Sequence, residues 1–207
     1  LGPAHPMCAD KNAKVPEVFY GQYLFMAEMS DSEGLPARPT YFDSPRGNVP
    51  VFLRMYREME AHLKLAADAV DAALPDVPER CRLVFDSESS AIRWFYRTAR
   101  AHANFYESCQ LRDALAALAG KPDKTPEELI VAREHYERWL RVLMDEKENA
   151  KAALPIMEAD VRLDWYYGSD HTFPHGADMI REKLRILDVE LAEVLPGVAR
   201  KVGLDGI

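Results

Sequence analysis

Two histidines and two aspartates lie close together in the C-terminal quarter of the sequence, and side chains of these types bind metal ions. The run Asp170-His171-x-x-x-His175-x-x-Asp178 offers two imidazoles and two carboxylates, which is a donor set that suits zinc or a similar ion. Pro174 interrupts the helical register between the histidines, and no cysteine joins them. We therefore predict a polar loop that leads into a helix, with no metal or other cofactor, and keep a metal-dependent hydrolase as the minor alternative.

Charged side chains alternate with apolar ones just before that run. Glu158, Asp160 and Asp164 follow one another, with Arg162 between them. Such carboxylates can accept charge-assisted hydrogen bonds from backbone amides or from Arg162, and they can also bind a ligand. We expect mainly structural anchoring. No partner group for acid–base catalysis is evident, so no catalytic residue is predicted.

Three adjacent aromatic residues follow the charged group. Trp165, Tyr166 and Tyr167 could stack on a sugar ring or a base, because an aromatic face offers broad apolar contact. We favour the prediction that these three side chains pack against the ends of helices or against a neighbouring domain. The candidate ligand-binding residues of this loop, which spans 157–175, are Trp165, Tyr166, Tyr167, Glu158, Asp160 and Arg162.

Other carboxylate pairs, such as Glu127/Glu128 and Glu146/Glu148, are predicted to lie on solvent-exposed helix faces. Pairing with Lys or Arg one turn away is the normal use of such residues. The histidines on the predicted helices do not supply the Glu-x-x-His motifs that di-iron bundles require. These residues are therefore not candidates for chemistry.

The composition limits the classes of partner. The net charge is −8 and no basic run is present, which argues against binding to nucleic acid backbones. No apolar run approaches the roughly 20 residues that span a bilayer. Cys8, Cys81 and Cys109 fit no zinc motif and are predicted to be free thiols, although one disulfide is the alternative for an exported protein. Periplasmic, secreted and cytoplasmic locations all stay open.

Helices must position these groups. Apolar residues recur every three or four positions and predict four long helices: from Asn48 to about Leu74, from a start near 86–90 to Gly120, from the Thr125-Pro126-Glu127-Glu128 capping box to Pro155, and over 176–195. The tail 198–207 is expected to add one turn. The predicted seams bury Met59, Phe95, Leu143, Ala150 and Leu187, among others.

The N-terminal region is predicted to differ from these four helices. Residues 1–15 read as an extended arm, and Val15 to Met29 form a shorter aromatic helix that is apolar nearly all round. We expect an all-α protein, an antiparallel up-and-down bundle of four long helices plus this shorter one, with residues 16–207 as a single domain. The sequence begins with Leu1 rather than Met and reads as a fragment of a larger multidomain protein.

One segment resembles a known family. The pattern is Glu148-Asn149-Ala150 … Leu154-Pro155 … Glu158-x-Asp160-x-Arg162-Leu163. It resembles the C-terminal helical regions of large, mostly uncharacterised bacterial proteins that are similar to glycoside hydrolases of the α-glucuronidase-like kind. Phe19-Tyr20-Gly21 and Tyr41-Phe42-Asp43 fit such regions more loosely. The sequence departs from the family pattern at Asp164, where a glycine usually follows Arg-Leu.

The resemblance implies a helical module that follows a catalytic (β/α)-barrel in polysaccharide-degrading bacteria. It carries over no catalytic residue, and only Glu158, Asp160 and Arg162 match the motif. Our leading hypothesis is therefore a non-catalytic accessory domain of a larger carbohydrate-active protein, with a neighbouring domain of the same polypeptide as its partner. The alternative is a free-standing module that binds a carbohydrate or a protein through the 157–175 loop.

Overall fold

The computed structural model describes residues 49–163 and 176–204, and every regular element in these two ranges is helical. The all-α prediction is therefore confirmed for the described residues, whereas the arm over 1–15 and the helix predicted over 15–29 lie outside them. The main helices are α1 (Val49–Ala73), α2 (Arg82–Ala119), α3 (Pro126–Ala159), α4 (Gly176–Val189) and α5 (Leu195–Val202). Short 3₁₀ turns cover Leu74–Asp76, Glu79–Cys81 and Val161–Leu163, and a π-helical turn covers Glu190–Val194.

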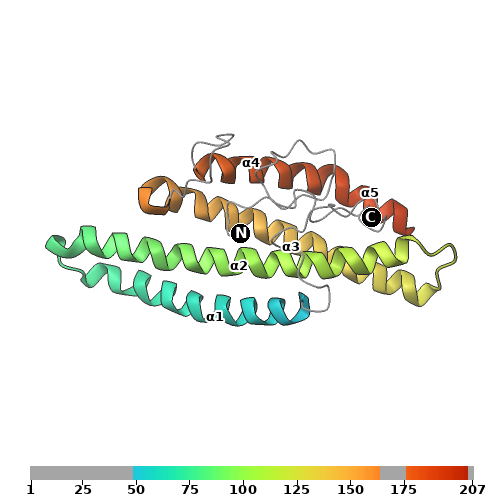
Figure 1. Ribbon diagram of the computed structural model, residues 1–207, viewed down its shortest axis with the longest axis horizontal. Coiled ribbons are helices and arrows are strands. Elements are labelled where there is room, and N and C mark those ends of the chain that lie inside the picture. The colour runs from blue at the N-terminus through green and yellow to red at the C-terminus, as the bar shows by residue number, and fades with distance from the viewer. Residues whose placement is uncertain (1–48, 164–175, 205–207) are drawn as a thin grey trace.

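The helices lie side by side in chain order (Figure 1), and α2 packs on α1, α3 on α2 and α4 on α3. The colours show that each long helix runs opposite to the one before it. The π-helical turn joins α4 to α5, which also contacts α2 and α3. Within the described ranges, no helix combines the length and apolar character that crossing a bilayer requires.

Local signals set several of the helix ends. Thr125 Oγ1 accepts a hydrogen bond from the Glu128 amide at 3.3 Å, and the Glu128 carboxylate accepts one from the Thr125 amide at 2.9 Å. This confirms the predicted capping box, which satisfies two amides at the start of α3. At the end of α5, Gly203 adopts a φ of +87°, a left-handed conformation that glycine adopts without strain.

Two helix ends were predicted wrongly. Helix α2 begins at Arg82 rather than near 86–90, because its first turn exposes Leu83 and Val84 and so carries no amphipathic signal. Helix α3 continues through Pro155 to Ala159. A proline removes the hydrogen bond to the carbonyl four residues earlier. That carbonyl belongs to Lys151, which is exposed, so water can take the place of the lost donor.

The core consists of two clusters along the helices. The larger surrounds Trp139, Leu143 and Leu187 and includes residues of α2, α3 and α5. The smaller joins the end of α3 to α4 around Ile180. Leu143, Ala150 and Leu187 are buried as predicted, whereas Met59 and Phe95 are exposed and those two predictions are wrong. Cys81 is an exposed free thiol, as expected; Cys8 and the Cys109 side chain lie outside the description.

Candidate functional site

Asp160 and Arg162, two of the residues singled out from the sequence, bind each other. Asp160 Oδ1 accepts hydrogen bonds from the Arg162 amide at 3.1 Å and from its Nε at 2.9 Å, and Oδ2 accepts one from Nη2 at 2.7 Å. Arg162 Nη2 also donates to the carbonyl oxygen of Ser87 in α2 at 2.5 Å. The Arg162 hydrogen bonds hold the pKa of Asp160 below its ordinary value. These hydrogen bonds are the contacts expected of an anchor, and they link the end of α3 to α2.

The next carboxylates also meet an arginine. Arg181 of α4 pairs with Glu158, and it donates to Asp178 at 2.7 Å. In the described part of the chain, no group of three or more His, Cys, Asp or Glu side chains is arranged to hold a metal ion. The other candidates lie outside the described residues, so their proposed roles stay predictions: Asp164, Trp165, Tyr166, Tyr167, Asp170, His171 and His175.

The sequence patterns do not identify the ion pair that is most deeply buried among the described residues. Glu146 of α3 forms an ion pair with Lys183 of α4, and their side chains are 0% and 1% exposed. Asn104 of α2 donates to Glu146 Oε2 at 2.9 Å, and Asn149 donates to the same oxygen at 3.4 Å and to the Arg97 carbonyl at 3.0 Å. The prediction that Glu146 faces solvent is therefore wrong: three donors compensate the burial of its charge.

The network continues outward through Asn104. Its Nδ2 also donates to Asp145 at 2.9 Å, and its Oδ1 accepts from Arg57 of α1 at 3.1 Å. Arg100 grips Asp145 through two nitrogens, one of them at 2.8 Å, and donates to the Tyr96 hydroxyl at 2.9 Å. Burial opposes ionisation of Asp145, but hydrogen bonds from Arg100 and Asn104 outweigh it, so the pKa of Asp145 lies below its ordinary value.

Glu107 of α2 joins two arginines from different helices. Arg57 donates to its Oε2 at 2.5 Å, and Arg138 of α3 donates to its Oε1. Arg57 also pairs with Glu60 at 2.7 Å. Burial by itself would raise the pKa of Glu107. The hydrogen bonds from Arg138 and Arg57 outweigh burial, so the pKa of Glu107 lies below its ordinary value. Charged side chains thus link α1 to α2, α2 to α3 and α3 to α4.

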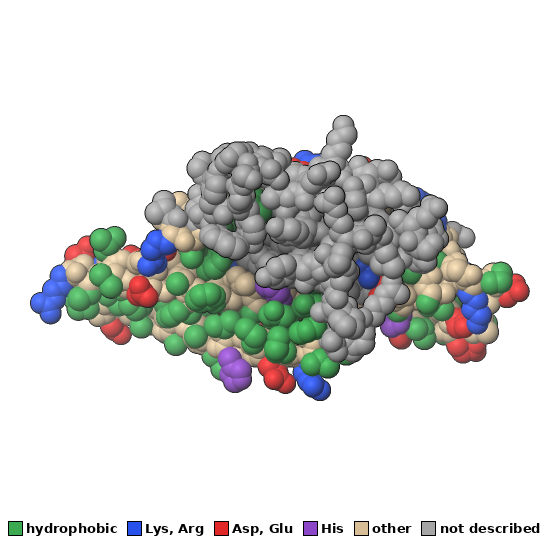
Figure 2. All heavy atoms as spheres, in the orientation of Figure 1, with side chains coloured by type: hydrophobic (Ala, Val, Ile, Leu, Met, Phe, Trp, Pro, Cys, Tyr) green, Lys and Arg blue, Asp and Glu red, His purple; other side chains and the backbone are tan. Residues whose placement is uncertain are grey.

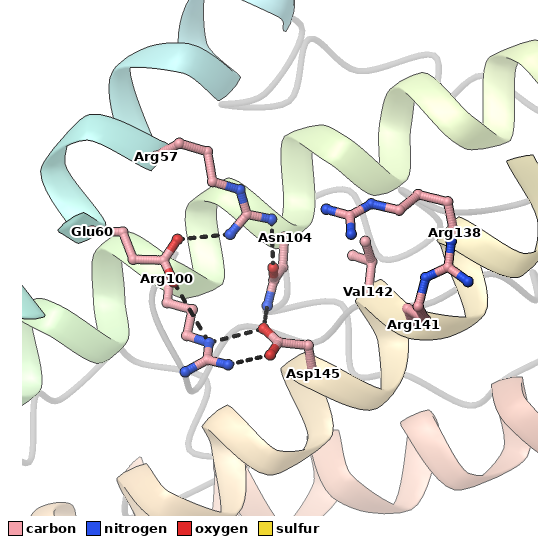
Figure 3. Close-up of a pocket in the computed structure, with 8 residues that line it drawn as sticks. All are labelled: Arg57, Glu60, Arg100, Asn104, Arg138, Arg141, Val142 and Asp145. Atoms are coloured by element: carbon pink, nitrogen blue, oxygen red, sulfur yellow. Dashed lines mark hydrogen bonds and ion pairs between the residues drawn. The ribbon is translucent and has the colours of Figure 1, made fainter.

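A cleft of about 230 Å³ opens between α1, α2 and α3 at the outer part of this network (Figure 3). Arg57 and Glu60 approach it from α1, Arg100 and Asn104 from α2, and the remaining side chains from α3. Its lining residues are Arg57, Glu60, Arg100, Asn104, Arg138, Arg141, Val142 and Asp145. A half-open cleft lined mainly by guanidinium and carboxylate groups is suited to a small charged ligand rather than to an apolar one.

His102, on α2, is the ionisable group of the described residues with the largest lowering of pKa. Its Nδ1 lies 2.8 Å from the Thr98 carbonyl, and its ring stacks on Tyr56 with the centroids 4.5 Å apart. Burial lowers the pKa of His102 to about 4. The imidazole is therefore neutral at pH 7 and donates from Nδ1 to the carbonyl, so the contacts assign it a packing role.

Comparison with protein-family models, with curated proteins and with solved structures finds no match for this chain.

Proposed function

We propose that the chain is a non-catalytic helical accessory domain of a larger carbohydrate-active protein, in which it forms an antiparallel up-and-down bundle and supports a neighbouring catalytic barrel. The motif that ends at Leu163 supplies the link to carbohydrate-active proteins. The observation that carries the supporting role is an exposed apolar surface on α1, which a neighbouring domain of the same polypeptide would cover.

That surface, the α1 apolar face, consists of Val51, Met55, Met59 and Leu65. These side chains are between 41% and 67% exposed. At about 100° per residue they fall within roughly one third of the helix circumference. Figure 2 shows hydrophobic side chains gathered over α1 and α2. The exposed side chains of Glu58 and His62 lie in the same sector, so polar residues interrupt this face before Leu65. Several exposed apolar side chains on one face of a helix still favour an interaction site over scattered exposure.

The charged network supports the same role. A supporting domain must hold its helices in fixed positions, and the contacts of Arg57, Asn104 and Glu146 tie four helices together through directional bonds. The contact between Asp160 and Arg162 lies in the segment that carries the family resemblance, and Arg162 also binds the Ser87 carbonyl of α2. Since these two side chains bind each other, they favour an anchoring role for the motif over the alternative of a glycan-binding loop.

The test begins with the gene. The reading frame is expected to encode a barrel domain next to this chain; a native protein with no further domain would reject the proposal. The barrel domain and this chain are then produced separately, and their affinity is measured by calorimetry. Replacing Met55 and Met59 by Glu should weaken binding at least about tenfold, since two charges would be buried in an apolar contact.

Met144→Glu is the matched control, because Met144 is a similarly exposed methionine on α3. It should leave the affinity unchanged. Equal affinity for the wild-type chain and the Met55→Glu, Met59→Glu variant would show that the α1 apolar face is not the contact surface.

A further inference from the structure

We propose that the cleft between α1, α2 and α3 binds a small molecule that bears a carboxylate or phosphate group, and that Arg138 and Arg141 are its principal donors. This inference is independent of the accessory-domain proposal, because it rests only on the side chains of the cleft.

Positive charge exceeds negative charge among the side chains that line the cleft. Four arginines line it, against the two carboxylates of Glu60 and Asp145. Two further carboxylates contact these arginines from outside the lining: Glu107 serves both Arg57 and Arg138, and Glu137 lies 3.8 Å from Arg141. Glu60 is likewise shared, at 2.7 Å from Arg57 and 3.7 Å from Arg100. Shared carboxylates leave guanidinium groups with capacity for a further anion.

Arg138 and Arg141 hold most of that capacity. Arg138 donates to Glu107 through Nε, and within the described ranges its two Nη atoms donate no hydrogen bond. Arg141 has one ion pair there, with Glu137 at 3.8 Å, which is longer than a hydrogen bond. The two side chains are 48% and 59% exposed. Figure 3 shows them on the side of the cleft opposite Arg57 and Glu60.

The geometry of these donors selects the ligand chemistry. A planar guanidinium presents paired N–H groups that match the oxygens of a carboxylate or a phosphate. Arg138 and Arg141 are three residues apart, so they project from neighbouring turns of one helix face. The cleft volume of about 230 Å³ suits a small metabolite. An open site with two such donors is expected to have a dissociation constant of about 1 mM.

The experiment titrates the full chain with inorganic phosphate and, in a second arm, with succinate, at constant ionic strength. Binding is followed by calorimetry and by the NMR signals of the arginine Nε–H groups. Saturable binding of either probe supports the proposal, and the arm that saturates more tightly identifies the anion class. Arg141→Gln should weaken that binding at least about tenfold, since it removes a charge-assisted contact.

Arg141 is exposed, so its replacement does not disturb the core. Arg80→Gln is the matched control: it makes the same charge change at an exposed position in the turn between α1 and α2, and it should leave the affinity unchanged. The proposal is overturned by the absence of saturable binding in both arms, or by equal affinities of the wild-type chain and Arg141→Gln.

Discussion

The Lys183 ammonium meets the Glu146 carboxylate in the interior of the protein, between α4 and α3. Removing two charges from water is expensive, and the attraction between them compensates only when further hydrogen bonds complete the arrangement. Asn104 and Asn149 supply those bonds to Glu146. Because this geometry fits one relative position of the helices, we infer that the ion pair fixes how α4 docks on α3.

Lys183→Met is expected to lower the free energy of unfolding by about 3–5 kcal/mol, because it leaves the Glu146 carboxylate buried without its cation. Urea denaturation measures the loss. The double variant Glu146→Leu, Lys183→Met removes both charges and should recover much of it. A loss below about 1 kcal/mol for Lys183→Met alone would show that the buried pair does not govern stability.

Leu187→Ala is expected to cost about 2–5 kcal/mol, as other fully buried leucines do. Leu187 lies in the larger core cluster and is completely buried. Leu65→Ala is the matched control, because Leu65 is exposed on α1, and its effect should stay within about 0.5 kcal/mol. Chemical denaturation of the two variants tests the assignment; equal losses would contradict the observed burial.

Arg162→Ala is expected to release the turn Val161–Leu163 from α2. The variant loses the bond to the Ser87 carbonyl and the contacts to Asp160. Amide hydrogen exchange around Asp160 should become faster, whereas exchange in the middle of α3 should not change, because local opening need not involve the core. Unchanged exchange at this turn would mean that the pair does not hold the end of α3 against α2.

Apolar periodicity predicted most of the fold, because helices that pack side by side bury one stripe each. The periodicity gave wrong predictions where an apolar residue at a seam position is in fact exposed. Phe95 and Met59 are apolar but exposed, so a pattern of apolar residues placed them wrongly. Pro155 predicts a helix end from the sequence, but its position on an exposed face lets α3 continue past it.

The charged network was less accessible to sequence reasoning. Glu146 lies three residues after Leu143 and four before Ala150, and both were predicted to be buried. Helical spacing alone therefore placed Glu146 on the buried face. Pairing with Lys or Arg one turn away, which is the normal use of such carboxylates, favours a solvent-exposed position instead. Its partner, Lys183, is 37 residues further along the chain, and no local pattern connects the two.

The stability of the protein is expected to fall as the pH falls from about 6.5 towards 4, because of His102. Burial lowers the pKa of His102 in the folded protein to about 4, against 6.5 for an unperturbed histidine, and the nearby Lys183 charge acts in the same direction. Well above pH 6.5 the imidazole is neutral in both states. Between the two values the unfolded chain binds a proton that the folded protein does not, so protonation favours unfolding.

Between pH 7 and pH 5 this linkage corresponds to a loss of about 2 kcal/mol in the free energy of unfolding. The carboxyl groups of Glu107 and Asp145 have lowered pKa values, so their contributions are lost only at more acidic pH. Urea denaturation at the two pH values measures the slope. His102→Phe keeps a ring against Tyr56 but cannot titrate, so its stability should change much less over this range. An equal pH dependence in the variant would assign the effect to other groups.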